Sequence, residues 1–429
     1  MVKKEKSSFL KLSDALNKIA PDGELIETSP LAKIDEWIPT GSYILNAALS
    51  GSLFGGLPNR RSLVLASPPE CGKTYIALSI CRKAQQMGYD IIYFDSEGAI
   101  DKEFVVRLGI DVSRMRLQPV NTIEEFNYIV AQMTKSIEEM KTNKEEVPKV
   151  MVVLDSLGNL SSEKEVTDSV EGSDKRDMTK QQQIRRLFRV NGLQFAKLGI
   201  PFIVCAHTYE KIGSYFPGQE VSGGGGIKYH ASIIFELSKK KLEDEEAEKR
   251  LKAKNVDSVK VGITVVVKPT KQRFARPIKV ELHIPLYKKP NPYVGLEKFV
   301  SWDSCGIMRG KALTEKQWEK LEEADRKLCN KFDGKNGEVL YALPKDTART
   351  LVCRHEGGEV PLVELFTEKV FTESVLRELD EKTIKPLFQL PDIQSLEDLK
   401  EIEEQMVGDN DGEFFEDKEL DEENRQEPN

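Results

Sequence analysis

The stretch Ser67-Pro-Pro-Glu-Cys-Gly-Lys-Thr74 decides the fold of this chain. An apolar run at residues 62–66 precedes it, and a helical pattern at residues 74–87 follows it. A strand, a glycine-bearing loop that ends in Lys-Thr, and a helix make up the phosphate-binding P-loop arrangement. Backbone N–H groups at the start of such a helix hold an anion, because they carry the positive end of the helix dipole. The stretch therefore predicts a nucleotide-phosphate site.

The residues of this loop have separate predicted roles. Lys73 supplies a positive charge for the β- and γ-phosphates of ATP, and the Thr74 hydroxyl is suited to bind Mg²⁺ beside them. Ser67 stands where the first glycine of the pattern is expected, so its φ angle must stay negative to avoid strain. We expect nucleotide contacts along the whole loop, from Ser67, Pro68, Pro69, Glu70, Cys71, Gly72, Lys73 and Thr74.

The composition is that of a globular protein with one large core. The chain has 429 residues, of which 39% are hydrophobic, enough for an α/β core with smaller additions. No apolar run of about 18 residues and no signal-like segment occurs, so we expect neither a membrane span nor export. Six cysteines lie far apart without a Cys-x-x-Cys pair, which predicts free thiols in a reducing, cytoplasmic location.

The acidic residues are concentrated at the C-terminus. The formal net charge of the chain is −8, and residues 397–429 carry 15 Asp and Glu against 3 Lys and Arg, a local charge of −12. The rest of the chain is therefore mildly basic, at +4. A basic body is suited to bind nucleic acid, and an acidic tail is suited to compete for the same surface.

Apolar runs and helical patterns alternate through the middle of the chain. Strands are predicted at residues 62–66, 90–95, 149–155 and 201–206, and helices at residues 74–87, 122–142 and 178–198. These strands are rich in Val and Ile with little alternation, which is typical of a mostly parallel, doubly wound α/β sheet. Later strands, predicted at residues 231–237, 256–268 and 278–284, have no long helices between them, so that side of the sheet should be mixed.

Three strand ends bring chemical groups to one edge of this sheet. In a doubly wound sheet the ligand lies beyond the carboxyl ends of the strands. Glu97 follows one strand, where it is suited to deprotonate a water that attacks the γ-phosphate. Asp155 ends a buried strand and is a candidate magnesium carboxylate. His207 ends a third strand, although a lone histidine there is more often structural.

Two polar loops follow these strands. Residues 161–177 form one predicted loop, which leads into a basic helix that carries Lys180, Arg185, Arg186 and Arg189. The second loop combines aromatic, glycine and basic residues, namely Tyr215, Phe216, Gly223, Gly224, Gly225, Gly226 and Lys228. A four-glycine run has no fixed shape unaided, so this loop should be mobile until a ligand orders it. Such a composition suits contact with a nucleic-acid backbone and bases.

Several further motifs accompany the P-loop, in a fixed order along the chain. They are Pro39-Thr-Gly-Ser42, Gly55-Gly-Leu-Pro58, Asp95-Ser-Glu97, Asp155-Ser-Leu-Gly158 and the glycine-rich loop. Over roughly residues 30–310 this set resembles the RecA family of recombinases. A second set is similar to the phage UvsX branch of that family: Asp155-Ser-Leu-Gly-Asn-Leu160, Asp177-Met-Thr179, Leu187-Phe-Arg189, His207-Thr-Tyr-Glu210 and Asn291-Pro-Tyr-Val-Gly-Leu296.

The resemblance implies a role for each residue of the nucleotide site. Glu97 would be the base that activates water, and Asp155 would serve the metal. Asp101 and Phe104 would contact adenine, the aromatic ring by stacking. His207 would sense the γ-phosphate and move the loop that follows it.

The resemblance also implies DNA contacts and an assembly. The two polar loops would bind DNA, and ATP would lie between subunits of a helical filament. Lys268 and Lys271, with Arg273 as a further candidate, would reach the phosphates of the neighbouring subunit. The family would then supply an activity: ATP- and Mg²⁺-dependent filament formation on single-stranded DNA, with homologous pairing to double-stranded DNA in recombination, repair and replication. The resemblance further implies two protein partners, a single-stranded-DNA-binding protein and a mediator. If the chain is phage-encoded, its location would be the host cytoplasm.

The expected organisation has four parts. Residues 1–40 would form an N-terminal helix that docks on its own core or on a neighbouring subunit, and residues 41–300 a RecA-like ATPase core. Residues 301–390 would form a small C-terminal domain with helices at 314–328 and 373–379, and residues 391–429 an acidic disordered tail. Two alternatives remain open: a hexameric helicase with a RecA-like core, and a non-catalytic DNA-binding accessory protein.

Overall fold

The computed structural model describes residues 7–20, 23–29, 31–172, 179–210, 219–221, 225–239, 262–285 and 291–391. The chain divides into two units, Met1–Gln389 and Leu390–Asn429. Of the predicted DNA-contacting residues, Tyr215, Phe216, Gly223 and Gly224 lie outside the described residues, as does nearly all of the acidic tail. Within the described part, no helix is both long and apolar enough to span a bilayer.

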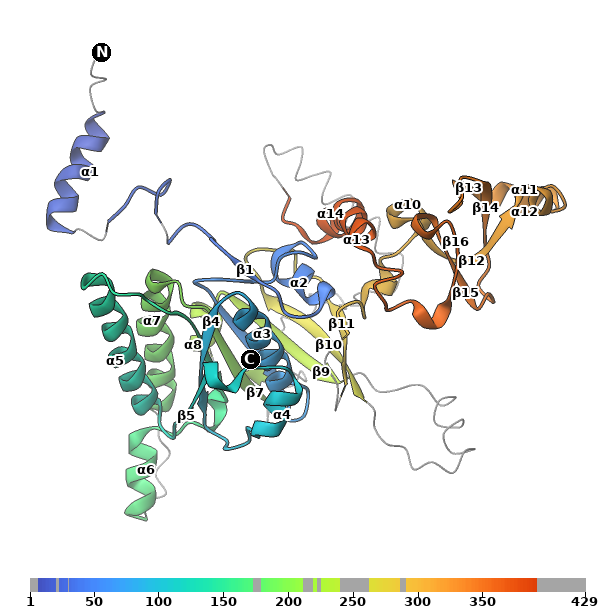
Figure 1. The fold of residues 1–429 in the computed structure, drawn as a ribbon. Helices are drawn as coiled ribbons and strands as arrows, with labels where there is room; N and C mark the ends of the chain where they lie inside the picture. Colours follow the sequence, from blue (N-terminus) through green and yellow to red (C-terminus); the bar gives the residue numbers. More distant parts are fainter. Residues whose placement is uncertain are drawn as a thin grey trace, which may run out of the picture. The chain divides into compact units, whose positions relative to one another are not determined.

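A mostly parallel sheet forms the centre of the first unit (Figure 1). Its nine strands are β3 (Ser62–Ser67), β4 (Tyr89–Asp95), β5 (Met115–Pro119), β6 (Lys149–Asp155), β7 (Phe202–Glu210), β8 (Gln219–Val221), β9 (Ile233–Lys239), β10 (Gly262–Lys271) and β11 (Val280–Pro285). The order is β11-β10-β9-β3-β7-β6-β4-β5, and β8 pairs with β7. Strands β9, β3, β7, β6, β4 and β5 run parallel, whereas β10 and β11 are antiparallel. The expectation of a doubly wound sheet with a mixed side is confirmed.

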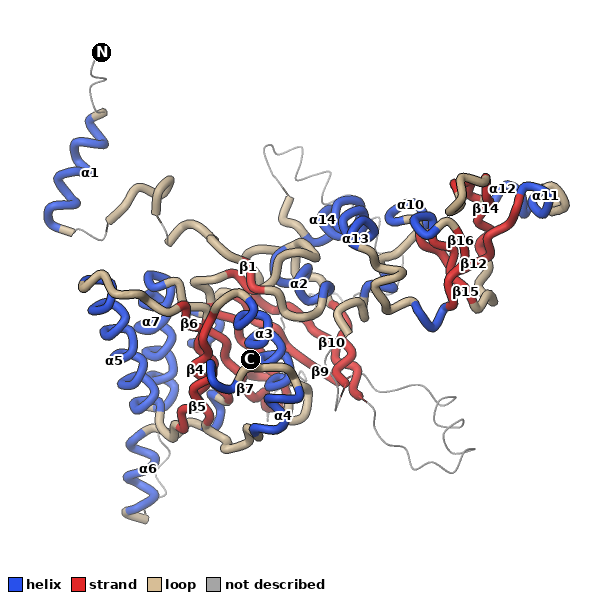
Figure 2. The backbone as a smooth tube through the Cα atoms, viewed as in Figure 1, coloured by secondary structure: helices blue, strands red, loops and turns tan. Residues whose placement is uncertain are grey.

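Helices cover both faces of this sheet (Figure 2). The bounds are α2 (Tyr43–Ser50), α3 (Lys73–Gln86), α4 (Lys102–Arg107), α5 (Ile123–Thr142) and α7 (Lys180–Leu198). Alternate residues of β3 belong to different cores: Leu63 and Leu65 pack with α2 and α3, whereas Val64 and Ala66 pack with α5 and α7. Both faces are apolar, so the central strands show continuous burial rather than alternation.

The two polar loops contain helices that the sequence analysis did not predict. Helix α6 (Glu163–Val170) lies in the first loop, where the Ser162 and Glu165 side chains form a capping box. None of its residues is buried, and Val166 and Val170 are its only aliphatic residues. In the second loop, Gly225 and Gly226 begin helix α8 (Gly225–His230) instead of remaining irregular. A Cβ atom at Gly226 would lie 2.4 Å from Arg185 Cγ, so glycine there allows α8 to pack closely on α7.

The N-terminal helix α1 (Ser8–Ile19) is amphipathic, as expected, and none of its residues is buried. Its apolar side chains are exposed, namely Phe9, Leu12, Leu16 and Ile19. A short two-stranded ladder follows it, made of β1 (Trp37–Ile38) and β2 (Leu57–Pro58). The surface on which α1 docks therefore remains a prediction.

The C-terminal part contains a second sheet that the sequence analysis missed. Its antiparallel order is β13-β14-β12-β15-β16, from β12 (Ile307–Thr314), β13 (Asn330–Asp333), β14 (Val339–Pro344), β15 (Thr350–Cys353) and β16 (Gly358–Pro361). Helices α10 (Trp302–Cys305), α11 (Glu315–Trp318), α12 (Glu323–Leu328), α13 (Glu373–Leu379) and α14 (Lys385–Phe388) accompany it.

The single helix predicted at 314–328 is wrong, because the chain breaks between α11 and α12. Trp318 stacks on Tyr341 with ring centroids 4.5 Å apart, and the Arg326 side chain returns to bond the carbonyls of Glu319 and Leu321. The helix predicted at 373–379 is confirmed as α13.

Asp380 joins the C-terminal helices to the core. Its side chain is 2% exposed, accepts a hydrogen bond from the Ser52 hydroxyl at 2.7 Å and accepts a second from the Leu53 amide at 2.7 Å. Gly51 lies against Gln389, and a Cβ atom there would lie 2.8 Å from the glutamine Cγ. The segment after α2 is therefore held by residues more than 300 positions later in the chain.

Candidate nucleotide-binding site

The P-loop turns sharply between β3 and α3. Glu70 and Gly72 both have left-handed backbone angles, with φ of 57° and 82°. Glycine is required at position 72, because a Cβ atom would lie 2.3 Å from Ile284 Cδ1 and would also strain the backbone. Ser67 is not among the residues with positive φ, so serine forms this turn without left-handed strain.

Lys73 is fixed within this turn. Its side chain reaches back over the loop, and Nζ donates to the Ser67 carbonyl at 3.2 Å, the Ser67 hydroxyl at 3.1 Å and the Pro68 carbonyl at 3.1 Å. The residue is 7% exposed, and burial lowers the pKa of its ammonium. A positive charge is therefore held where an anion would meet the first turn of α3.

The registers of the parallel strands explain why distant residues meet here. Asp95 lies opposite Asp155 on neighbouring β4 and β6, and Ser67 lies opposite His207 on neighbouring β3 and β7. Strands β3, β4 and β6 end at this edge of the sheet, whereas β7, predicted to end at residue 206, continues past His207 to Glu210. The side chains at this edge therefore converge beside the P-loop.

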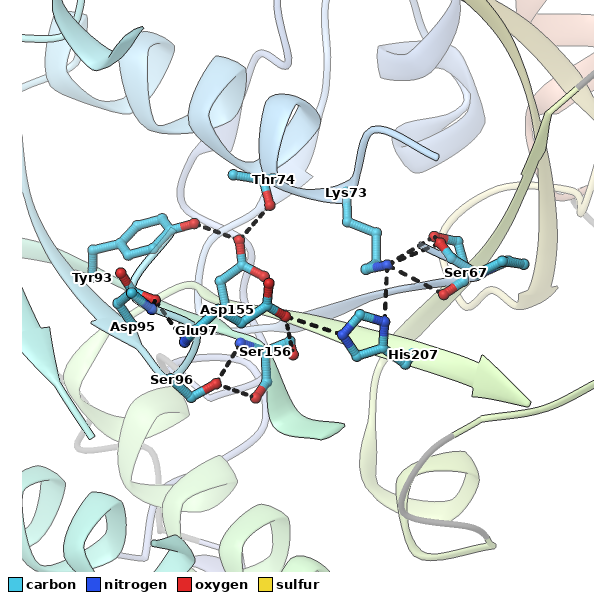
Figure 3. Close-up of polar contacts among 12 residues, drawn as sticks. Ser67, Lys73, Thr74, Tyr93, Asp95, Ser96, Glu97, Asp155, Ser156 and His207 are labelled. Carbon is cyan, nitrogen blue, oxygen red and sulfur yellow. Dashed lines mark hydrogen bonds and ion pairs between the residues drawn. The ribbon is translucent and has the colours of Figure 1, made fainter. Parts of the chain in front are cut away.

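Asp155 receives two hydrogen bonds on one oxygen (Figure 3). The Thr74 hydroxyl and the Tyr93 hydroxyl each donate to its Oδ2 at 2.6 Å. Burial raises the pKa of Tyr93 well above its ordinary value, and the charge of Asp155 adds to this effect. The tyrosine hydroxyl therefore remains a hydrogen-bond donor at neutral pH.

Glu97 is held in a comparable way. Its Oε1 accepts a hydrogen bond from the Ser156 hydroxyl at 2.7 Å and lies 3.0 Å from His207 Nε2. Burial acts to raise the pKa of Glu97, but the bonds with Ser156 and His207 outweigh it, so the pKa is lowered from its ordinary value. His207 Nδ1 in turn lies 3.5 Å from Lys73 Nζ, so the histidine stands between the lysine and the carboxylate.

The turn that carries Glu97 is itself hydrogen-bonded. Asp95 Oδ1 accepts from the amides of Glu97 and Gly98, both at 2.9 Å. The Ser96 hydroxyl donates to the Ser156 carbonyl at 2.7 Å and accepts from the Ser156 amide at 2.9 Å. The peptide bond between Asp155 and Ser156 is cis. These contacts connect the ends of β4 and β6.

A cavity of about 590 Å³ opens in front of these groups. This volume falls within the range of roughly 300–1,000 Å³ that is usual for small-molecule sites. It is lined by Pro69, Glu70, Cys71, Gly72, Lys73, Thr74, Tyr75, Glu97, Phe104, Asp155, His207, Lys239, Ile263, Ile284 and Pro285. Most of the predicted nucleotide-binding residues are therefore brought together.

Asp101 is not among the residues that line the cavity. Its carboxylate caps α4 by accepting from the Phe104 amide at 2.9 Å, and it is exposed. Phe104 does line the cavity, so of the two predicted adenine contacts the structure brings the aromatic one to the site.

The Thr74 and Asp155 side chains fit a magnesium ion by their chemistry. Both present oxygen, which Mg²⁺ prefers, and they lie 2.6 Å apart at the wall of the cavity. Among the described residues, no group of three His, Cys, Asp or Glu side chains is placed to hold a metal. Few protein ligands are expected for an ion that keeps its water and binds phosphate oxygens.

The three candidate trans cations are at or just after the end of β10. A register shift occurs between Pro269 and Lys271, so Lys268 and Lys271 do not keep a regular alternation. Lys268 is exposed, and so is Arg273. Lys271 Nζ instead donates to the carbonyls of Lys228 at 2.6 Å and Tyr229 at 3.0 Å, at the end of α8. None of the three lines the cavity of its own subunit.

The predicted DNA-contacting residues that are described lie on α7 and α8. Arg185, Arg186 and Arg189 are exposed on α7, and Lys228 is exposed on α8. Lys180 forms an ion pair with Glu165 of α6 at 3.3 Å, which joins the first loop to the basic helix.

Sequence reasoning missed several residues of this site, among them Tyr93, Ser96, Ser156 and Lys239. Ser96 and Ser156 follow Asp95 and Asp155 directly, so their position after strand ends was a usable signal. Tyr93 gave no signal, because it lies within a strand. Lys239 is the last residue of β9, so its position at a strand end was also a usable signal. Lys239 also lies 3.0 Å from Glu70 of the P-loop.

A family model described as the RecA N-terminal domain matches residues 18–288, which include every group of this site. A protein named "Recombination and repair protein" of Enterobacteria phage T4 is 30% identical over 203 residues. That match covers 47% of this chain and 50% of the phage protein.

Bacterial relatives are covered more completely. The protein named "Protein RecA" of Thermus thermophilus is 30% identical over 333 residues, which cover 72% of this chain and 88% of that protein. The protein of the same name from Thermus aquaticus is 28% identical over 339 residues, covering 74% of this chain and 91% of its own length.

Proposed function

This chain belongs to the RecA family, and from that premise we propose that it is a DNA-dependent ATPase that forms a helical filament on single-stranded DNA and catalyses homologous pairing and strand exchange. One observation carries the proposal: Lys73, Thr74, Glu97, Asp155 and His207 line the same cavity. The names of the relatives support a role in recombination and repair.

The chemistry proposed for this cavity is hydrolysis of the γ-phosphate of ATP. Lys73 would bind the β- and γ-phosphates together with the amides of the first turn of α3. Thr74 and Asp155 would hold Mg²⁺, which supplies positive charge against the phosphates. Glu97, whose pKa is lowered by its bonds with Ser156 and His207, would accept a proton from the attacking water.

The proposed coupling to DNA runs through β7. His207 touches both Lys73 and Glu97, so a γ-phosphate bound by Lys73 would change the surroundings of the imidazole. Strand β7 continues to Glu210 and pairs with β8, which precedes the glycine-rich segment and α8. We expect this path to change DNA affinity when the γ-phosphate is lost, which is a coupling between two sites.

Assembly would complete the site in this proposal. Lys268, Lys271 or Arg273 of a neighbouring subunit would add positive charge to the transition state, so hydrolysis would depend on filament formation. Double-stranded DNA, a single-stranded-DNA-binding protein and a mediator are the further partners that we propose.

Electron microscopy of the full chain with single-stranded DNA tests the proposal. Open helical filaments are expected with a non-hydrolysable ATP analogue, and loss of regular filaments without nucleotide. Closed rings would instead indicate a hexameric helicase, and no assembly would indicate an accessory DNA-binding protein. Strand exchange between homologous DNAs, measured on agarose gels, is the second expected result.

A further inference from the structure

The proposed mechanism gives no role to the Tyr93 hydroxyl, although it touches the candidate magnesium carboxylate. Tyr93 lies in β4, one strand away from Asp155 on β6. Its side chain is fully buried, and its hydroxyl donates to Asp155 Oδ2 at 2.6 Å (Figure 3). A buried tyrosine hydroxyl needs a hydrogen-bond partner. Here the partner is the Asp155 carboxylate, which is also the group proposed to hold Mg²⁺.

The same carboxylate oxygen accepts the hydrogen bond from Thr74 at 2.6 Å. The terminal torsion of an aspartate is soft and has broad minima, so one hydrogen bond leaves the carboxylate plane loosely defined. Two donors that approach one oxygen from different elements fix that plane. Groups that orient a metal-binding side chain in this way commonly set metal affinity without touching the metal.

Thr74 and Tyr93, the two donors to Asp155, differ in whether they have a further proposed role. Thr74 is itself assigned to the metal, so its hydroxyl oxygen has a second task when Mg²⁺ binds. Tyr93 has no such task, and its backbone is paired on both sides, with Leu117 of β5 and Val153 of β6. Its ring belongs to the core between the sheet and α3, so the hydroxyl has a fixed position.

We propose that Tyr93 is a positioning residue that orients the Asp155 carboxylate, and that it thereby sets the Mg²⁺ concentration at which nucleotide binds. This inference rests on the proposed function, because it takes Asp155 as the magnesium carboxylate. Tyr93 does not itself line the nucleotide cavity, and it acts through Asp155, which does.

Replacement Tyr93→Phe tests the inference, because it removes the hydroxyl and keeps the ring. Tyr89→Phe is the matched control: Tyr89 lies in the same strand, is 2% exposed, and donates to Glu36 Oε2 at 2.7 Å. Binding of a fluorescent N-methylanthraniloyl ATP to the full chain is titrated with Mg²⁺, and the melting temperature of each variant is recorded.

Tyr93→Phe should raise the Mg²⁺ concentration for half-maximal nucleotide binding by about 10-fold or more. At saturating Mg²⁺ its nucleotide affinity should return to the wild-type value, and Tyr89→Phe should titrate as the wild type does. The same Mg²⁺ dependence in Tyr93→Phe and wild type would overturn the inference. So would an equal shift in both tyrosine variants, since that would be a general effect on β4. If nucleotide binding by the wild type does not depend on Mg²⁺ at all, the assignment of Asp155 to Mg²⁺ in the proposed function is wrong. This result differs from a failure of the Tyr93 inference, in which the wild type depends on Mg²⁺ and Tyr93→Phe does so equally.

Discussion

Lys73 shows how individual residues prepare this site for an anion. Its ammonium is buried, and its three hydrogen bonds go to oxygens of the loop that precedes it. A bound phosphate would replace these neutral acceptors with charged ones, which make stronger hydrogen bonds. The loop and its lysine thus form one hydrogen-bonded unit at the start of α3.

Lys73→Ala should abolish ATP-dependent filament formation, because the phosphates lose their buried positive charge. The measurement is electron microscopy with single-stranded DNA and ATP, supported by nucleotide-binding titrations. Lys83→Ala is the control: Lys83 lies in the last turn of the same helix, outside the nucleotide cavity. Normal strand exchange by the Lys73 variant would contradict the assignment of the site.

Glu97→Gln should keep nucleotide binding and slow hydrolysis by at least about a hundredfold, because an amide takes no proton from water. An amide oxygen still accepts the bond from Ser156, so the local structure should persist. Phosphate release is measured with saturating single-stranded DNA, and Glu103→Gln on exposed α4 is the control. An unchanged rate would mean that another residue is the base.

The residues of the site differ in how far the sequence predicted them. Glu97 follows an apolar strand, Asp155 ends another and His207 lies in a third, so their placement at one edge followed from the strand pattern. Tyr93 lies inside such a strand, where a tyrosine is usually a core residue, and only the register of β4 with β6 shows its contact. Asp101 caps α4 and does not line the cavity, so its contact with adenine stays a prediction.

At the scale of elements, the long strands and helices of the core were predicted closely. Helices α6 and α8 were not, because both are short, with eight and six residues, and offer few apolar positions from which to recognise a helix. The Ser162–Glu165 pair was a usable signal for α6, since a serine followed three residues later by glutamate is a capping box. Helix α8 depends on contacts from distant residues, Arg185 and Lys271, which no local pattern contains.

Lys271→Met should loosen α8, because the ammonium no longer binds the carbonyls of Lys228 and Tyr229. Hydrogen exchange of α8 amides should speed up by about 2- to 10-fold, as expected for a net loss of about 0.5–1.5 kcal/mol. Lys268→Met is the control, since Lys268 is an exposed lysine of the same strand. Unchanged exchange in α8, or equal changes in both variants, would show that this contact contributes no local stability.

At the scale of the whole molecule, the alternation of strands and helices predicted the central sheet, whereas the C-terminal sheet was missed. Its strands are short, and β13 has only four residues, so alternation is hard to distinguish from chance. The charged residues between Thr314 and Leu328 suggested one helix, but packing of Trp318 on Tyr341 divides it. Tertiary contacts of this kind override local propensity.

Removal of residues 397–429 should tighten binding to single-stranded DNA, because it removes a local charge of −12 from a chain whose remainder is at +4. Fluorescence anisotropy with a labelled oligonucleotide at low salt measures the change. A full-length chain with the tail Asp and Glu replaced by Asn and Gln is the control that separates charge from length. Unchanged affinity at low salt in both proteins would show that the tail does not compete with DNA.

The hydrogen bonds of the Asp380 carboxylate have a practical consequence for the expression of truncated forms of this protein. A truncation near residue 300 appears natural, since the matched family region ends at residue 288. Such a fragment would leave the Leu53 amide without its acceptor and would uncover the apolar surface now covered by Phe388. Expression trials should therefore stop no earlier than residue 389, and a protease that cuts near residue 300 should release an N-terminal fragment prone to precipitate.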